Sequence, residues 1–218
     1  MFQLIKNSNT ESIVAAIRHL LQQPKPGISA QKAMLPKGRL LQAKGSIPPR
    51  SSAVLLLLYP QNNELYFPLI RRPIYNGMHS GQMALPGGKM EEGDASLIQT
   101  ALRESHEEIG VDKNSVEILG SLTDLYIEIT HMQVLPVVGY VGKKPDFSIQ
   151  VSEVDALFEI PLSHLFNPEL KKKEWWNLRG ELIEIPFYHL SEQKVWGATA
   201  MILSEFEQLL LPFKENLK

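Results

Sequence analysis

A run of eight residues, Arg103 to Gly110 (RESHEEIG), contains one arginine and three glutamates whose spacing could support chemistry. Each residue of a helix advances about 100° around the axis, which puts Glu104, Glu107 and Glu108 together on one side. Glu104 and Glu108 are also i,i+4 neighbours, and like charges at that spacing destabilise an isolated helix by about 0.2–0.5 kcal/mol. No lysine within this helix offsets the repulsion. The pattern predicts either a solvated acidic face or a site for a cation.

The other side of the same helix is predicted to face the core. Residues at spacings of three and four form this side: Ile98, Ala101, Leu102, Ser105 and Ile109. A divalent cation would relieve the glutamates opposite, because Mg²⁺ binds carboxylate oxygens together with waters and substrate phosphate oxygens. The PGGK turn at residues 86–89 precedes the helix, and its glycines let the backbone approach a ligand closely. These residues alone predict a metal-assisted phosphate site.

Seven residues of this region resemble the Nudix box, the strand-loop-helix-loop signature of diphosphate hydrolases: Gly88, Asp94, Arg103, Glu104, Glu107, Glu108 and Gly110. The right half, RESHEEIGV, matches the family pattern with Ser105 in the slot for an apolar residue. The left half differs, because Gly88 to Arg103 is one residue longer than the pattern and Asp94 stands near its first glutamate. In the family that glutamate braces the helix arginine, so the resemblance implies that Asp94, or alternatively Glu92, braces Arg103.

One branch of the family, the coenzyme A pyrophosphatases, has the same one-residue extension and the same aspartate. Its upstream motif is similar to PLIRRPIYNGMHSGQMALPGG, in which Arg72, Gly81, Gln82 and the Pro86-Gly87-Gly88 turn take matching places. Ile70 replaces a threonine of that motif, and Gly77 stands where it has a second arginine. The segments QKAMLPKGR, SEVDALFEIPLSHL and VWGATAMIL extend the resemblance over about residues 25–210.

The resemblance implies a role for each residue of the site. The catalytic residues are Arg103, Glu104, Glu107 and Glu108, and Arg103 is expected to orient a carboxylate. The three glutamates and Gly88 are the expected ligands of Mg²⁺ or Mn²⁺. The expected substrate contacts are Arg72, Gly81, Gln82, Gly87, Gly88 and Lys89. His79 is a weaker candidate for a ligand contact and Glu153 for a general base, since an ordinary structural role explains either residue.

The implied reaction is Mg²⁺-dependent hydrolysis of coenzyme A or its thioesters to 3′,5′-ADP and 4′-phosphopantetheine, or its acyl form. One alternative keeps the chemistry and changes the substrate to ADP-ribose, NADH or another nucleoside diphosphate derivative. A second alternative is a Nudix-fold binding module without catalysis, which should have lost metal-ligand glutamates that this chain retains.

The elements that must position these residues follow from patterning along the chain. A helix is predicted from residue 10 or 11 to 23, then a proline-rich connection to residue 49. Two apolar runs around Gln61-Asn62-Asn63 predict a hairpin, and its first strand is apolar on both faces, which is typical of a central strand. Residues 73–93 are predicted to be a long loop, and a helix over 94–109 ends at Gly110.

The second half of the chain alternates strands with helices. Strands are predicted over 116–127, 134–141 and 181–190, a strand with a short helix over 151–166, and a closing helix over 196–213. Lys171 to Lys173 are expected to be a solvated stretch, and Trp175 and Trp176 to pack in a core or an interface. This order indicates an α/β or α+β fold, and the resemblance implies an α/β/α sandwich with a mixed sheet and the catalytic helix after a Gly-Gly loop. We expect one domain at 51–218, with 1–50 packed on it as a helix and extended segment.

Composition limits the other classes of function. The net charge of −2 gives no field that would recruit nucleic acid or an anionic membrane. The absence of cysteine excludes disulfides and thiolate metal sites. No stretch approaches the roughly 20 apolar residues of a membrane span, and the N-terminus lacks the apolar core of a signal peptide. We expect a cytoplasmic protein that binds a small nucleotide substrate, and a homodimer is left open.

Overall fold

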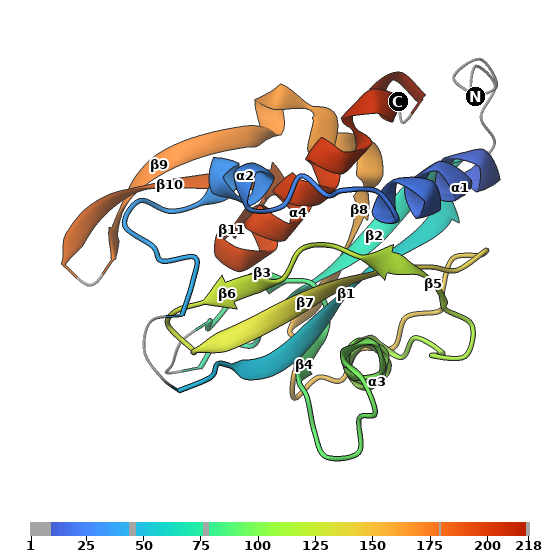
Figure 1. The fold of residues 1–218 in the computed structure, drawn as a ribbon, viewed down its shortest axis with the longest axis horizontal. Coiled ribbons are helices and arrows are strands. Elements are labelled where there is room, and N and C mark those ends of the chain that lie inside the picture. Colours follow the sequence, from blue (N-terminus) through green and yellow to red (C-terminus); the bar gives the residue numbers. More distant parts are fainter. Residues whose placement is uncertain (1–9, 44–46, 76–78, 179, 217–218) are drawn as a thin grey trace.

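The computed structural model describes residues 10–43, 47–75, 79–178 and 180–216. Figure 1 shows a twisted sheet with helices on both faces and a second, smaller sheet beside them. The helices are α1 (Thr10–Leu21), α2 (Ile28–Gln31), α3 (Leu97–Ile109) and α4 (Gly197–Leu210). Short 3-10 segments occupy Lys32–Met34, Leu162–Phe166, Pro168–Leu170 and Leu211–Asn216.

The larger sheet is mixed and is ordered β3-β2-β1-β7-β5. Its strands are β1 (Arg50–Gln61), β2 (Glu64–Arg71), β3 (Met83–Ala84), β4 (Gly87–Lys89), β5 (Glu117–Ser121), β6 (Leu125–Ile127), β7 (Met132–Tyr140) and β8 (Ala156–Pro161). β1 pairs parallel with β7 and antiparallel with β2 and β4, while β8 pairs with β2 and β6 with β7. The mixed sheet between helices confirms the predicted fold class.

The hairpin of β1 and β2 turns at two asparagines, as the sequence predicts. Gln61 pairs with Glu64, and Asn62 and Asn63 both have positive φ, at 50° and 64°. Asparagine tolerates this left-handed conformation better than most residues, and two such residues form the turn whose twist suits a hairpin. The turn therefore fixes the register of β1 against β2.

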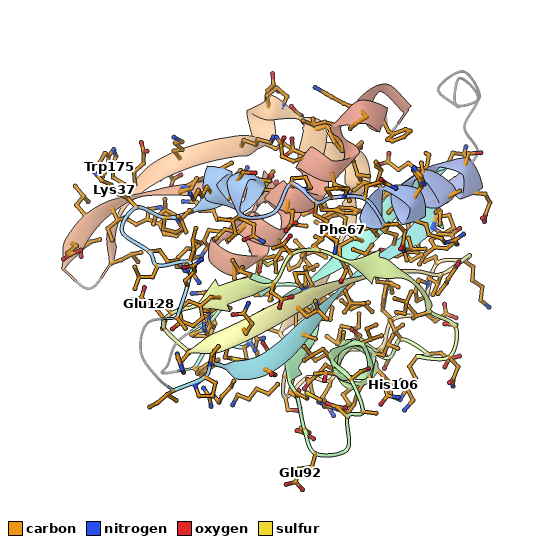
Figure 2. All side chains as sticks on the ribbon, in the orientation of Figure 1. Lys37, Phe67, Glu92, His106, Glu128 and Trp175 are labelled. Carbon is orange, nitrogen blue, oxygen red and sulfur yellow. The ribbon has the colours of Figure 1, made fainter. Side chains whose placement is uncertain are left out.

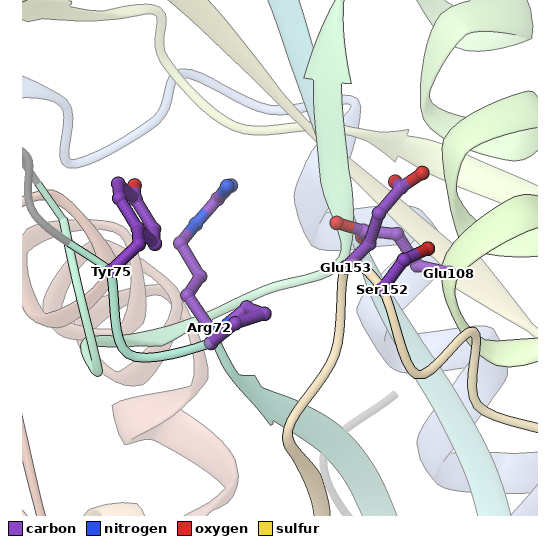
Figure 3. A pocket seen from close by; sticks show the side chains of 6 residues that line it. Arg72, Tyr75, Glu108, Ser152 and Glu153 are labelled. Atoms are coloured by element: carbon purple, nitrogen blue, oxygen red, sulfur yellow. The ribbon is translucent and has the colours of Figure 1, made fainter.

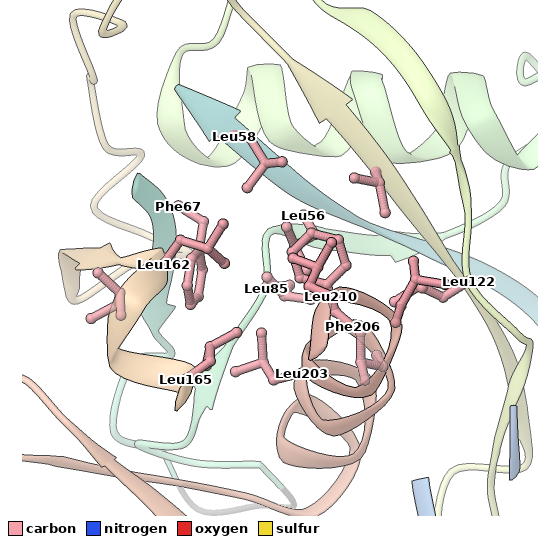
Figure 4. Packing of buried hydrophobic residues seen from close by; sticks show 14 of the residues in the cluster. Leu56, Leu58, Phe67, Leu85, Leu122, Leu162, Leu165, Leu203, Phe206 and Leu210 are labelled. Atoms are coloured by element: carbon pink, nitrogen blue, oxygen red, sulfur yellow. The ribbon is translucent and has the colours of Figure 1, made fainter. Parts of the chain in front are cut away.

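β1 contributes to both layers of the core, because its successive side chains point to opposite faces. Leu56 and Leu58 pack in the cluster under α1 and α4, which Figure 4 shows from close by. Leu55 and Leu57 pack in the cluster that contains Ala101 and Ile109 of α3. The prediction of a central strand covered on both faces is confirmed.

The strand β9 (Lys171–Leu178) begins with the three lysines that we expected to be solvated. Lys172 and Lys173 are exposed, as expected, and Lys171 is partly buried. β9 pairs with β10 (Glu181–Leu190), which also pairs with β11 (Gln193–Trp196). Lysine has a low strand propensity. Two of the three lysines form ion pairs in this strand: Lys171 with Glu207 of α4, and Lys173 with Glu184 of β10.

The two neighbouring tryptophans of β9 have opposite environments, because they point to opposite faces of the small sheet. Trp176 packs against Trp196, with 5.2 Å between ring centroids, which confirms the expected packing for this residue. Trp175 is 62% exposed and lies at the outer surface in Figure 2.

The long loop predicted over residues 73–93 is partly ordered as strands. β3 pairs with β2, and β4 pairs with β1 in the register Ala53↔Gly88 and Val54↔Gly87. Two or three residues are too few for a hydrophobic pattern, so the sequence gives no strand signal there. The two glycines of the predicted turn therefore lie in β4, beside the central strand, and the loop over residues 90–96 leads from them to α3.

Candidate active site on helix α3

Local signals set the ends of α3. The Ser96 side chain caps its N-terminus by accepting a hydrogen bond from the Gln99 N–H at 3.3 Å. Gly110 ends the helix in the left-handed conformation, with φ at 73°. The predicted end is confirmed, whereas the predicted start at residue 94 is wrong, because Asp94 lies in the preceding loop and its side chain serves the site instead.

Arg103 holds several groups of the site together. Its Nε and Nη2 atoms donate to the two carboxylate oxygens of Asp94, each at 3.0 Å. Nη1 donates to Glu107 at 2.8 Å, and Nη2 also contacts Glu104 and the Lys89 carbonyl, both at 3.0 Å. Hydrogen bonding to this guanidinium lowers the pKa of Asp94 to about 2, although burial acts in the opposite direction. Arg103 thus fixes the side chains around it.

The predicted bracing of Arg103 by Asp94 is confirmed. Asp94 is itself held, because its Oδ2 accepts hydrogen bonds from the Thr100 hydroxyl at 2.9 Å and from the Glu91 N–H at 3.1 Å. Glu92, the alternative brace, points away from the site at the tip of the loop before α3 (Figure 2).

Glu104 lies against the backbone of Gly88. A Cβ atom added to Gly88 would overlap the Glu104 carboxylate, so the sequence needs glycine at this position for close approach. Burial raises the pKa of Glu104, and the Arg103 charge opposes this rise. The strand before the helix and the helix itself therefore enclose this carboxylate from two sides.

Glu108 is the most deeply buried of the three glutamates, at 3% exposed. Its Oε2 accepts a hydrogen bond from the Gly87 N–H at 2.8 Å. Burial raises the pKa of Glu108 to about 7, which the Gly87 hydrogen bond and the Arg72 charge only partly offset. The nearby charges of Glu104 and Glu153 raise it further.

The three glutamates do not share one solvated face, so that alternative is wrong for Glu108. The Glu107 side chain is 48% exposed and pairs with Arg103. The segment before β8 meets the C-terminal end of α3, because the Ser148 and Gln150 N–H groups donate hydrogen bonds to the Ile109 and Glu108 carbonyls. The Glu108 side chain itself accepts a hydrogen bond from the Gly87 N–H of β4. On the predicted core side, Ile98 is instead exposed. Such contacts come from residues distant in sequence, which helical periodicity cannot reveal.

A cavity of about 380 Å³ opens beside Glu108. Its lining residues come from the loop after β2, from α3 and from the segment before β8: Arg72, Pro73, Tyr75, Glu108, Ser152 and Glu153. Figure 3 shows Arg72 between Tyr75 on one side and Glu108, Ser152 and Glu153 on the other. The predicted candidates Arg72 and Glu153 thus lie close to Glu108. Sequence reasoning missed Tyr75 and Ser152, although Tyr75 lies within the upstream motif.

The loop after Arg72 is closed by its own hydrogen bonds. The Arg72 N–H donates to the Gln82 carbonyl at 3.0 Å, and the Gly81 N–H donates to the Pro73 carbonyl at 3.2 Å. Gly81 has φ at 65°, in the region that favours glycine. Gln82 and His79 face each other, with 3.0 Å between Oε1 and Nδ1. The structure thus shows Gly81 and Gln82 holding the backbone of Arg72, and Gly77 lies outside the described residues.

The donor set suits a hard divalent cation. Glu104 and Glu108 are carboxylates withdrawn from water, and this burial raises the pKa of both. In the part of the chain that the structure describes, no three acidic or histidine side chains converge closely enough to form a ready metal site. Glu107 is directed toward Arg103 instead. Lys89 contributes its carbonyl to Arg103, while its side chain is exposed.

None of the helices in the described part of the chain is long and apolar enough to cross a membrane.

Comparison with known proteins agrees with this geometry. The family model described as NUDIX domain matches residues 49–184, a range that contains β1, the Gly-Gly turn and α3. Over 144 residues the chain is 38% identical to the Nudix hydrolase NudL of Yersinia enterocolitica, covering 64% of this chain and 71% of that protein.

Two further relatives have similar identities. The chain is 34% identical over 158 residues to NudL of Escherichia coli O7:K1, which covers 72% of this chain and 80% of that protein. It is 33% identical over 162 residues to the mitochondrial Nudix hydrolase 15 of Arabidopsis thaliana, covering 71% of this chain and 56% of that protein. The chain thus spans little more than half of the plant protein. On the match of more than half its length and on these relatives, the chain belongs to the Nudix hydrolase family.

Proposed function

We propose that this Nudix hydrolase cleaves coenzyme A or its thioesters in an Mg²⁺- or Mn²⁺-dependent reaction, giving 3′,5′-ADP and 4′-phosphopantetheine or its acyl form. One observation carries the chemistry: the buried carboxylate of Glu108 lines a cavity together with Arg72, and Glu104 lies one helical turn before Glu108 on α3. Acidic groups that need a cation, next to an arginine that can bind phosphate, fit a metal-dependent diphosphate site.

Glu104, Glu107 and Glu108 are the proposed metal ligands, with the Gly88 carbonyl as a fourth. Gly88 supports this assignment because its backbone lies against the Glu104 carboxylate. Glu107 forms an ion pair with Arg103, and its carboxylate would bind the metal ion while it keeps that contact. The chemistry that such an ion supplies is neutralisation of phosphoryl oxygens and activation of a water for attack at phosphorus.

The protein's own groups prepare the reaction. Asp94 and Arg103 fix the position of Glu104, and the Gly87 N–H fixes Glu108. Arg72 would hold a phosphate group by charge-assisted hydrogen bonds, with Lys89 as a second cation at the edge of the turn. Glu153 lies across the cavity from Arg72 and is the proposed acceptor of the proton that the attacking water loses.

The choice of coenzyme A rests on the segment between Arg72 and Gly88, whose motif resembles that of the coenzyme A pyrophosphatases. Arg72, Gly81 and Gln82 support this choice, since the latter two fix the backbone that presents Arg72 to the cavity. The replacement of the motif's second arginine by Gly77 removes one cation from that pattern. ADP-ribose and NADH are therefore the substrates to compare.

The test is product analysis with a panel of diphosphates at saturating Mg²⁺. Coenzyme A, dephospho-coenzyme A, ADP-ribose and NADH are compared by kcat/KM, with a chelator and the Glu104→Gln variant as controls. Release of 3′,5′-ADP from coenzyme A at the highest kcat/KM supports the proposal. A higher kcat/KM for ADP-ribose or NADH would show that coenzyme A is the wrong substrate assignment. Turnover that does not depend on metal would overturn the mechanism.

A further inference from the structure

The cavity has an aromatic end that the chemistry at phosphorus does not use. Tyr75 lines it on the side opposite Glu108, Ser152 and Glu153, and Arg72 extends between the two groups (Figure 3). The cavity therefore presents, in order, an aromatic ring, a cation and carboxylates. A nucleoside diphosphate bound to metal has the same sequence of chemistries: an aromatic base, anionic phosphates and the ion.

The backbone around Tyr75 is held in place. The Tyr75 N–H donates to the Ser80 hydroxyl at 2.9 Å, and the Gly81 N–H donates to the Pro73 carbonyl at 3.2 Å on the way back. Pro73 has a fixed φ, which limits the directions in which the chain can leave Arg72. Tyr75 is nevertheless 47% exposed, so a large apolar ring remains in contact with solvent at the cavity.

We infer that Tyr75 is the base-binding residue of this site and stacks on the nucleobase of the substrate while Arg72 holds a phosphate of the same nucleotide, which in coenzyme A is the 3′-phosphate. Stacking on an aromatic side chain covers the base and accepts any base, because every base has a π face. The nucleoside half of the substrate then lies along Arg72 and Tyr75, and the diphosphate reaches toward Glu108. This inference rests on the proposed diphosphate hydrolysis and adds the orientation of the substrate.

Two small ligands isolate the contribution of the base. AMP and ribose 5-phosphate carry the same phosphorylated sugar, but only AMP has a base, so the ratio of their Kd values measures recognition of the base. Stacking of this kind typically changes affinity by about tenfold. Both Kd values are measured by titration calorimetry in Mg²⁺ on the wild-type protein and on three variants: Tyr75→Phe, Tyr75→Leu and Ile74→Ala.

Each variant has a distinct purpose. Tyr75→Phe keeps the aromatic ring. Tyr75→Leu removes the ring but keeps an apolar side chain. Ile74 is the matched control, since it is the neighbouring residue, is 85% exposed and is not part of the cavity wall. Substitutions at exposed loop positions usually change stability little, and melting temperatures of all four proteins check that each is folded.

The expected result is that wild type, Tyr75→Phe and Ile74→Ala bind AMP about tenfold more tightly than ribose 5-phosphate. In Tyr75→Leu the ratio should fall close to one while the Kd of ribose 5-phosphate stays unchanged. AMP binding no tighter than ribose 5-phosphate in wild type, an unchanged ratio in Tyr75→Leu, or equal weakening of both ligands would overturn the inference. Failure of the proposed function is separate, since it would appear as absent diphosphate hydrolysis in wild type.

Discussion

The guanidinium of Arg103 meets both carboxylate oxygens of Asp94, from Nε and Nη2, each at 3.0 Å. The pair links the loop before α3 to the face of the helix that carries Glu104 and Glu107. Two parallel hydrogen bonds between charged partners fix orientation as well as distance. A shorter acid in place of the family's glutamate therefore maintains the same brace, and the extra residue between Gly88 and Arg103 does not prevent it.

Asp94→Asn should destabilise the protein by on the order of 2 kcal/mol, because hydrogen bonds to charged partners are typically worth about 1.5–3 kcal/mol. The pKa of Asp94 is lowered from 3.8 to about 2 on folding, so its ionised form favours the folded state. The difference in the free energy of unfolding between wild type and variant should have its full size above about pH 4 and should disappear as the pH falls through about 2. Urea unfolding between pH 2 and 7 measures it. Glu92→Gln, at the exposed tip of the same loop, should match wild type throughout, and a loss of stability equal to that of Asp94→Asn would contradict the brace.

Glu104→Gln and Glu108→Gln should each lower kcat by at least about a hundredfold, the loss typical when electrostatic stabilisation of the transition state is removed. Both substitutions keep the size of the side chain and remove an acid whose charge is costly where it lies, so the folded protein should persist. Initial rates at saturating Mg²⁺ and melting curves check both statements. Glu92→Gln serves again as the control, and wild-type turnover in both variants would eliminate these residues as metal ligands.

Without metal, the stability of the protein should fall as the pH rises from about 4.5 to about 7. The pKa of Glu108 rises from 4.5 to about 7 on folding, so the folded state holds a proton in this range that the unfolded chain has lost. Mg²⁺ should reverse the trend, because an ion that binds the ionised carboxylates stabilises only the folded state. Melting temperatures at several pH values, with chelator and with Mg²⁺, measure this effect. Glu108→Gln should show a flatter dependence in chelator; a slope as steep as that of wild type would assign the titration to another group.

Coenzyme A should be a better substrate than dephospho-coenzyme A, which lacks the 3′-phosphate, by roughly tenfold in kcat/KM. A hydrogen bond between arginine and phosphate is typically worth about 1.5–3 kcal/mol; the replacement of the motif's second arginine by Gly77 favours the lower end. Arg72→Ala should reduce this preference more than it reduces turnover of dephospho-coenzyme A. Steady-state kinetics of both proteins on both compounds measure it. Equal loss on the two substrates would mean that Arg72 contacts the diphosphate and not the 3′-phosphate.

Sequence reasoning located the acidic helix, the β1–β2 hairpin and the Asp94 brace because their signals are local. Apolar residues at helical spacing, two apolar runs around the turn asparagines, and the resemblance of residues 88–110 to the Nudix box all lie within short stretches. It did not predict the burial of Glu108, because that side chain meets the Gly87 N–H and shares a cavity wall with Ser152 and Glu153, which lie more than 40 positions further along the chain. It also missed Tyr75, whose place in the cavity wall depends on the path of the loop, and β9, in which Lys171 is paired by the distant Glu207.

The contact between Gly87 and β1 couples the site to the central strand of the sheet, which is buried in the core. A Cβ at Gly87, where φ is 150°, would overlap the Ala53 carbonyl and the Val54 backbone, so the turn lies directly on the central strand. Amide groups in such strands exchange with solvent only when a large part of the protein opens. The Gly87 N–H that holds Glu108 should therefore exchange its hydrogen about as slowly as the amides of β1. A substitution that weakens the core packing around Ala53 would then displace the Glu108 carboxylate, although no residue that contacts Glu108 is changed.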